Sequence, residues 1–355
     1  MIEPQRNTSQ YFKGRGATFN PTNRFEKISV VFEESCNAED NPSLKTEFFK
    51  DSSRSFITYN DSPDVGFSAS INPYRGCEHG CIYCFARPTH EYLGFSSGLD
   101  FETKIMVKMD APQLLRKELS SPKWQPQVLA FSGVTDCYQP IERHLKLTRQ
   151  CLEVLREFRN PVGIVTKNHL VARDIDLLKE LNRFQAAAVF ISVTTLDHRL
   201  ASLMEPRASC PEDRLKAIQE LSQEQIPVGV LVAPVIPALT DHEIPSIVSH
   251  CAKAGATFAG YVMLRLPFAV KNLFEEWLIR HFPDRKEKIL NRIRDIRSGK
   301  LNDPRYGLRL KGEGVFAQEI AQLFSLACKK EGLNRKPELS TASFLRPQGS
   351  QPTLF

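Results

Sequence analysis

Six short apolar runs alternate with amphipathic segments through the middle of the chain. The runs, at 65–71, 127–133, 162–167, 187–195, 227–236 and 258–266, each have the length of a strand. The segments at 142–158, at 173–184, from 210 onward and at 244–254 have the periodicity or the start signals of helices. Because the runs are almost continuously apolar, we expect parallel strands covered by helices on both faces. The pattern predicts an α/β fold with about six parallel strands, too few for a closed eight-stranded barrel.

Outside this repeat the sequence changes character at both ends. Residues 1–64 are polar and rich in Asn and Ser, whereas 281–355 hold a basic segment and then a tail with Pro and Ser. We therefore expect an N-terminal extension over 1–64, a core over 65–280, and a basic helical region with a flexible tail over 281–355. The polar N-terminus and the absence of a long apolar run in the sequence predict a cytoplasmic protein.

Three of the nine cysteines stand close together, at Cys77, Cys81 and Cys84, and the others are scattered. This distribution indicates reduced thiols and one metal site rather than a disulfide framework. Three thiolates spaced C-x3-C-x2-C can bind three irons of a 4Fe-4S cubane and leave the fourth iron open. Gly76 and Gly80 would permit the tight backbone path. The alternatives are a structural zinc site with His79 or His90 as fourth ligand, or three ordinary thiols.

This loop, with Tyr83 before its last cysteine, resembles that of the radical S-adenosylmethionine (SAM) superfamily, and the resemblance covers roughly 66–270. The segments 134–142, 165–167, 204–207 and 233–241 resemble the branch that contains spore photoproduct lyase and proteins labelled DNA repair photolyase. The resemblance implies a partial (β/α)6 TIM-type barrel with N- and C-terminal extensions. It also implies two cofactors, a 4Fe-4S cluster and SAM.

The activity implied by the resemblance is reductive cleavage of SAM at the cluster to a 5′-deoxyadenosyl radical, which takes a hydrogen atom from the substrate. For this branch the substrate would be nucleic acid, and the reaction would be DNA repair or base modification, of the kind that a lyase performs. An electron donor such as flavodoxin or ferredoxin would be needed. The alternatives are radical modification of a protein or a small metabolite, or a non-catalytic iron–sulfur protein.

The resemblance also implies roles for residues near the strand ends. The implied cofactor contacts are Tyr83, Thr135 and Asp136 (the amino end), Lys167 (the carboxylate), Ser192, and Val235 within the adenine-contacting segment 233–237. Loop caps, a solvated lysine and a serine bonded to its own backbone are the ordinary alternatives. Glu205 and Arg207 would form an ion pair or anchor a substrate anion. Arg265, at the end of the sixth strand, would bind an anion in the cavity or form a salt bridge at the rim of the cavity.

One position departs from the lyase pattern. Spore photoproduct lyase carries a hydrogen-returning cysteine three residues before the aspartate that aligns with Asp136, and Gly133 stands there in this sequence. Cys137 would take over as the catalytic hydrogen donor, or it is a small buried hydrophobe. Repair of the spore thymine lesion is therefore doubtful.

Two features of the C-terminal region suggest partners. Residues 280–300 hold eight basic and three acidic side chains, a local charge of +5 out of +6 for the chain. Ile289, Ile293 and Ile296 would pack inward, while Arg285, Lys288 and Arg292 would face phosphates of DNA or simply solvent. The terminal Gln351–Phe355 resembles the Q-x-x-L-F peptide that docks bacterial repair proteins on the sliding clamp. Alternatively, Leu354 and Phe355 fold back onto the protein.

Overall fold

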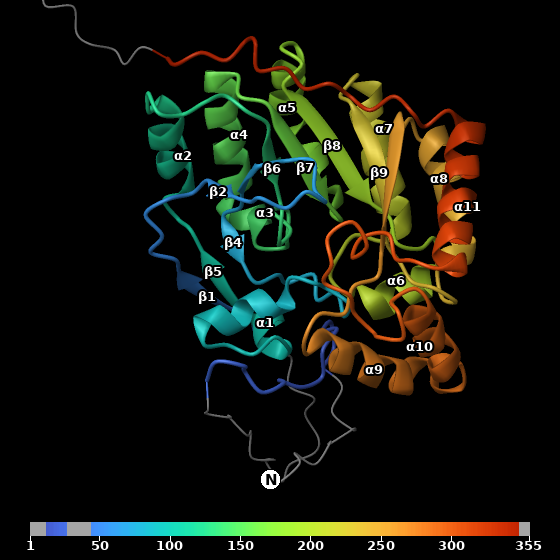
Figure 1. Ribbon diagram of the computed structural model, residues 1–355. Helices are drawn as coiled ribbons and strands as arrows, with labels where there is room; N and C mark the ends of the chain where they lie inside the picture. Colours follow the sequence, from blue (N-terminus) through green and yellow to red (C-terminus); the bar gives the residue numbers. More distant parts are fainter. Residues whose placement is uncertain (1–11, 27–43, 348–355) are drawn as a thin grey trace, which may run out of the picture.

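The structure is a computed structural model that describes residues 12–26 and 44–347, and an open seven-stranded sheet forms its centre (Figure 1). The sheet runs β10 (Phe258–Met263), β9 (Val228–Val235), β8 (Ala187–Ser192), β7 (Val162–Thr166), β6 (Leu129–Phe131), β3 (Ala69–Ile71) and β2 (Thr58–Tyr59). β3 and β6 to β10 are parallel, and β2 is antiparallel to β3. The predicted α/β fold with six parallel strands, arranged as a partial barrel, is confirmed.

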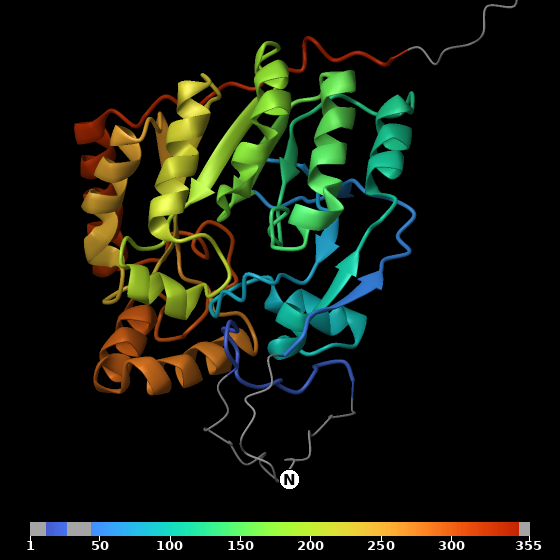
Figure 2. The same ribbon diagram turned by 180° about the vertical axis from the view of Figure 1, so that it is seen from behind.

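Helices cover one face of this sheet (Figure 2). They are α4 (Leu147–Phe158), α5 (Ile175–Asn182), α7 (Pro211–Gln223) and α8 (Ile244–Lys253), with α2 (Ala111–Ser120) packed on α4 and α11 (Val315–Glu331) on α8. The expectation of helices on both faces is wrong. On the other face, an ion pair joins Asp64, between β2 and β3, to Arg309. The next residue, Leu310, accepts a hydrogen bond from the N–H of Met263 in β10 (2.8 Å). These contacts connect the two edges of the sheet.

Further elements surround the carboxyl ends of the strands, and among them the sequence predicted only a basic helix beyond 280. A small sheet contains β1 (Glu47–Lys50), β5 (Lys104–Val107) and β4 (Tyr74–Arg75). The helical elements are α1 (Leu99–Thr103), α6 (His198–Met204), α9 (Val270–His281), α10 (Lys286–Asp295), η1 (Arg87–Leu93), η2 (His169–Asp174), η3 (Asp241–Glu243) and η4 (Pro283–Arg285). One hydrophobic cluster here joins Phe12, Met204 and Ile289, which come from all three expected parts. The boundaries near 64 and 280 stay a proposal.

The helix expected over 142–158 is interrupted. α3 (Glu142–Leu145) ends at Lys146, which has a left-handed backbone (φ 53°), and α4 then begins. The Glu142 carboxylate turns back to accept the N–H of Thr148 at 3.1 Å, in the first turn of α4. It also receives the hydroxyl of Tyr74 and the guanidinium of Arg173. This buried carboxylate therefore caps the start of α4, because it also accepts the N–H of Arg149 (3.4 Å).

Beyond 280 the sequence prediction was partly correct. Ile289, Ile293 and Ile296 are buried as expected. α11 was missed, because its exposed Leu323 and Leu326 fall between buried positions and weaken the helical pattern. No helix among the described residues is long and apolar enough to span a membrane.

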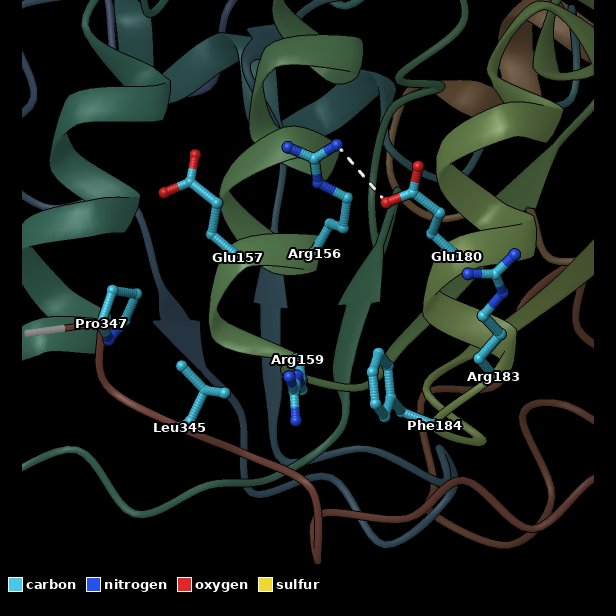
Figure 3. A pocket seen from close by; sticks show the side chains of 8 residues that line it. All are labelled: Arg156, Glu157, Arg159, Glu180, Arg183, Phe184, Leu345 and Pro347. Atoms are coloured by element: carbon cyan, nitrogen blue, oxygen red, sulfur yellow. Dashed lines mark hydrogen bonds and ion pairs between the residues drawn. The ribbon is translucent and has the colours of Figure 1, made fainter.

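The last described residues run across the end of the sheet opposite the strands' carboxyl ends. Ser340 donates to the Gln185 carbonyl (2.9 Å), and Leu345 donates to that of Phe158 (3.0 Å). A surface hollow of about 500 Å³ borders this segment (Figure 3). It is lined by charged side chains of α4 and α5 and contains none of the expected site residues.

Candidate functional site

The three cysteines lie in a loop that begins where β4 ends, at the carboxyl end of the parallel strands. Cys77 and Cys81 are buried and Cys84 is half-buried. Gly76 and Gly80 have φ of 81° and 68°, a left-handed backbone that other residues adopt at a cost. A Cβ on Gly80 would lie 2.8 Å from Glu102 Oε2. The glycines thus permit the tight path expected of them.

A buried ion pair holds the cysteine loop in place. The side chains of Arg87 and Glu102 are both 0% exposed and form a salt bridge. Arg87 also donates to the carbonyls of Cys81 (3.0 Å) and Gly80 (3.3 Å). The Glu102 carboxylate accepts the N–H groups of Gly16 (3.0 Å) and Ala17 (2.8 Å). The pair therefore ties the cysteine loop to α1 and to the N-terminal segment.

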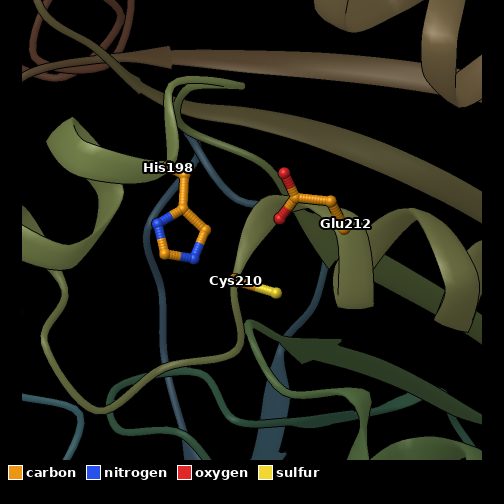
Figure 4. Close-up of side chains that lie close together, drawn as sticks. All are labelled: His198, Cys210 and Glu212. Carbon is orange, nitrogen blue, oxygen red and sulfur yellow. The ribbon is translucent and has the colours of Figure 1, made fainter.

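The donor set of the loop fits a multi-iron cluster. A single tetrahedral zinc would place its sulfur ligands about 3.8 Å apart, from Zn–S bonds of about 2.3 Å. Among the described residues, only His198, Cys210 and Glu212 form a set of three donors that all lie within 4.8 Å (Figure 4). The loop thiols form no such set, either among themselves or with His79 or His90. As placed, the loop thiols are therefore not gathered around a single-ion position, and three thiols from one short loop suit a cubane held at three corners.

Two side chains of the loop fasten it to the segment after β6. The Glu78 N–H donates to Gln139 Oε1 (2.9 Å), and its carboxylate accepts the N–H of Ile141 (2.8 Å). Glu78 also pairs with Arg207 (3.0 Å). His79 lies between Asp136 (3.4 Å) and Asn168 (3.2 Å). Arg207 is thus paired with Glu78, and the expected ion pair with Glu205 is wrong.

Asp136 is bonded inside the protein. Its carboxylate accepts the hydroxyl of Thr166 (2.8 Å) and the N–H groups of Lys167 (2.8 Å) and Tyr138 (2.9 Å). Burial alone would raise the pKa of the Asp136 carboxyl, but His79 and these donors lower it. Thr135 is likewise buried and donates to the carbonyl of Tyr74 (2.8 Å). Both residues join β6 to neighbouring segments, which is closer to the loop-cap interpretation than to a cofactor contact.

Four expected site residues do converge in one polar cluster. Lys167 Nζ donates to Ser192 Oγ (2.7 Å) and lies 3.2 Å from Glu205 Oε1. The Tyr83 hydroxyl also bonds to Glu205. Burial and the nearby Arg214 guanidinium lower the pKa of Lys167 to about 7. The cluster adjoins the loop cysteines, since Lys167 Nζ lies 5.7 Å from the ring centroid of Tyr83, which directly precedes Cys84.

Comparison with known proteins identifies the family. The family model of the radical SAM superfamily matches residues 71–251, which span half of the chain and contain the cysteine loop and the polar cluster. The chain belongs to the radical SAM superfamily. Members of this superfamily use a 4Fe-4S cluster and SAM, so these are its cofactors.

Relatives of this radical SAM protein include an uncharacterized protein of Mycobacterium tuberculosis, 35% identical over 68% of this chain and 70% of that protein. The radical SAM Nalpha-GlyT isomerase of Pseudomonas phage M6 is 29% identical over 50% of this chain and 35% of its own length. Spore photoproduct lyase complexed with dinucleoside spore photoproduct has a similar fold, with a TM-score of 0.57 at 16% identity, covering 81% of this chain and 80% of the lyase.

Cys137 lies away from this site. Its side chain is 0% exposed and belongs to the hydrophobic core between the sheet and its helices. The hydroxyl of Thr148 donates to the Cys137 carbonyl (2.7 Å), and burial raises the pKa of its thiol. The structure favours the packing interpretation over hydrogen return. A Cβ atom on Gly133 would lie 3.2 Å from Ser70 Cβ, so Ser70 leaves little room for a larger residue at position 133.

Arg265, in contrast, is free to bind. Among the described residues its guanidinium has no hydrogen bond or ion pair, and its Nε is buried without a partner. Its Cζ lies 5.4 Å from the centroid of the Phe85 ring, beside Cys84. The expected rim salt bridge is therefore absent from the described structure, and the anion-binding interpretation is favoured.

The basic face of α10 is partly engaged by the protein itself. Arg292 lies 3.5 Å from the Phe316 centroid and pairs with Asp295, and Arg285 donates to the Ala238 carbonyl (2.6 Å). Lys288 is exposed. Val235 is fully buried, and its carbonyl accepts the N–H of Leu264 (3.0 Å).

Sequence reasoning missed four residues of the site. They are Arg87, Glu102, Thr194 and Arg214. Thr194 donates to Glu205 (2.7 Å) and Arg214 forms a buried ion pair with it. Their buried polar groups give no local signal, because the partners stand 9 to 15 positions apart in the chain.

Proposed function

We propose that this radical SAM enzyme acts on nucleic acid, in DNA repair or base modification. The observation that carries the proposal is Arg265, a cation that has no partner within residues 12–26 and 44–347 and lies over Phe85 next to a cluster cysteine. A nucleotide offers the matching chemistry, because its base stacks on an aromatic ring and its phosphate pairs with a guanidinium. The fold likeness to a lyase complexed with a dinucleoside supports this substrate class.

The residues of the chain divide into holding and positioning roles in this proposal. Cys77, Cys81 and Cys84 hold the cluster. When bound, the cluster and SAM supply a 5′-deoxyadenosyl radical that takes a hydrogen atom from the substrate. Lys167 would turn its ammonium to the SAM carboxylate in place of its present bonds to Ser192, Thr194 and the Ala233 carbonyl. The Lys167 side chain is 15% exposed and Glu205 beside it is 0% exposed, so this ammonium is largely shielded from bulk water.

The remaining expected contacts are assigned supporting roles. Thr135 and Asp136 position the loop that carries His79, since their polar groups are already bonded within the protein. Arg207 fixes Glu78 in the cysteine loop. Tyr83 orients Glu205, and Val235 lines the wall by its buried side chain. The reaction is then either cleavage by a lyase or modification of a base. A group other than Cys137 returns the hydrogen atom.

The test uses the reconstituted enzyme with deuterated DNA and RNA pools and, separately, a deuterated peptide pool. We expect deuterium in 5′-deoxyadenosine only with nucleic acid. Cys81→Ala serves as the control, since loss of one thiolate anchor should abolish cluster absorption and SAM cleavage. Transfer from peptides alone would favour the protein-modifying alternative. SAM turnover without transfer from any pool would point to a small metabolite.

The expected partners are part of the same proposal. Gln351–Phe355, the expected clamp-binding peptide, lies outside the described residues. Titration of the sliding clamp with a peptide covering 346–355 tests the motif, and a Leu354→Ala, Phe355→Ala peptide is the control. No binding up to about 1 mM would refute it. A cytoplasmic flavodoxin or ferredoxin would supply the electron.

A further inference from the structure

Exposed aromatic rings gather beside the cysteine loop. We call this surface the aromatic rim, and it consists of Phe25, Phe85, Tyr92 and Phe268 with Arg24 and Arg265. The four rings are 55%, 46%, 73% and 56% exposed, in that order. They come from three segments, the N-terminal one, the cysteine loop with η1, and the turn after β10. All three meet at the carboxyl end of the sheet, where the cluster cysteines lie.

The rings are connected by direct stacking and by arginine. Phe25 and Tyr92 stack with centroids 4.9 Å apart. Arg24 lies between two rings, with its Cζ 3.7 Å from the Phe268 centroid and 5.0 Å from that of Phe25. Phe25, Tyr92 and Phe268 thus form one cluster through Arg24, and Phe85 lies under Arg265. Large rings clustered in water mark a binding surface, because isolated exposed rings occur by chance but clustered ones are costly to leave uncovered.

The charges of the rim select the class of ligand. Arg24 is neutralised by Glu91, and Arg309 on the far side of Arg265 is neutralised by Asp64. Within the described residues Arg265 is the one rim cation without an ion pair or hydrogen bond. Burial and repulsion from Arg309 lower the pKa of the Arg265 guanidinium, so an added anion would relieve this repulsion. A ligand that alternates flat rings with single negative charges fits this arrangement.

We propose that the aromatic rim binds a single-stranded segment of nucleic acid, with bases stacked on Tyr92, Phe268 and Phe85 and one phosphate on Arg265. The proposal rests on the nucleic-acid function proposed above and adds the form of the substrate. Paired bases hide their faces within a duplex, so stacking on exposed rings requires unpaired ones. Phe85 follows Cys84 directly, so a base seated on it would lie beside the cluster cysteines.

The test measures binding of a fluorescein-labelled oligo(dT) of about 12 nucleotides to the full-length protein by fluorescence anisotropy. Tyr92→Ala and Phe268→Ala should each weaken binding roughly tenfold. Arg265→Met should also lower the slope of log affinity against log salt by about 0.7, the value for one phosphate of a single strand. Tyr59→Ala is the matched control, since this ring is 65% exposed but lies on edge strand β2.

Photocrosslinking with a bromouridine-substituted oligonucleotide gives an independent readout. Crosslinks in peptides that contain 85–92 or 265–268 would support the rim. Equal affinity of wild type and all rim variants, or crosslinks confined to α10 with binding lost only in Lys288→Met, would overturn it. The two proposals fail separately. Rim-dependent binding without deuterium transfer from nucleic acid refutes only the proposed reaction, whereas transfer without rim dependence refutes only the rim.

Discussion

The buried pair of Arg87 and Glu102 gives a sharp test of how the cysteine loop is held. Replacing Arg87 by Met keeps most of the side-chain volume but removes the charge and every hydrogen bond to the loop carbonyls. Among the described residues, the buried Glu102 carboxylate would then keep only two backbone donors, from Gly16 and Ala17. Removing one partner of a fully buried ion pair costs about 3–5 kcal/mol, because the remaining charge is desolvated without compensation.

The matched control is Arg116→Met. Arg116 pairs with Glu157 at 2.5 Å, but the two side chains are 46% and 35% exposed. Solvent screens this pair, so its loss should lower the free energy of unfolding by only about 0–1 kcal/mol. The two substitutions are chemically identical, so the difference between them measures what burial and the carbonyl hydrogen bonds of Arg87 add.

Two measurements are made on each variant. The first is anaerobic urea unfolding of the cluster-free protein, and the second is the iron content of a separate sample after reconstitution. Arg87→Met should unfold at a clearly lower urea concentration and should bind less iron, because the carbonyls of Gly80 and Cys81 lose their donor. Arg87→Lys should be intermediate, since an ammonium keeps the charge but lacks the planar fork of donors. Equal losses of stability in Arg87→Met and Arg116→Met would refute the reasoning.

Three further predictions concern single residues. Lys167→Met should keep the cluster absorption but raise the Kd for SAM roughly tenfold to a hundredfold, the effect of one charged hydrogen bond, and unchanged SAM binding would exclude Lys167 from that site. Cys137→Ala should lower stability slightly and leave the product distribution unchanged, whereas new side products would restore it as the hydrogen donor. Burial lowers the pKa of His90 to about 4, whereas the unfolded chain keeps a value of about 6.5. As the pH falls, the unfolded chain therefore takes up the proton first. The stability that the neutral His90 contributes is fully present above about pH 6.5 and is lost as the pH falls toward 4. The unfolding free energy of the cluster-free protein should drop by about 2 kcal/mol more between pH 7 and pH 5 in wild type than in His90→Phe, and parallel pH curves would contradict this assignment.

The sequence by itself determined the elements that depend on local pattern. The six parallel strands follow from apolar runs of strand length, and the inward stripe of α10 follows from isoleucines at helical spacing. The cysteine loop is equally local, because its ligand spacing and its two glycines are contiguous. Such features are readable since the periodicity of a strand or a helix puts burial directly into the order of residues.

The tertiary structure decided which polar groups meet. Glu205 and Arg207 are near neighbours in sequence, yet Glu205 pairs with Arg214 and Arg207 pairs with Glu78. The Tyr83 hydroxyl reaches Glu205 across 122 positions of the chain. Cys137, adjacent to Asp136, faces the opposite side and enters the core. These outcomes depend on how the loops at the carboxyl ends of the strands pack together, because a buried charge must find its partner among whatever segments the fold brings within hydrogen-bond distance.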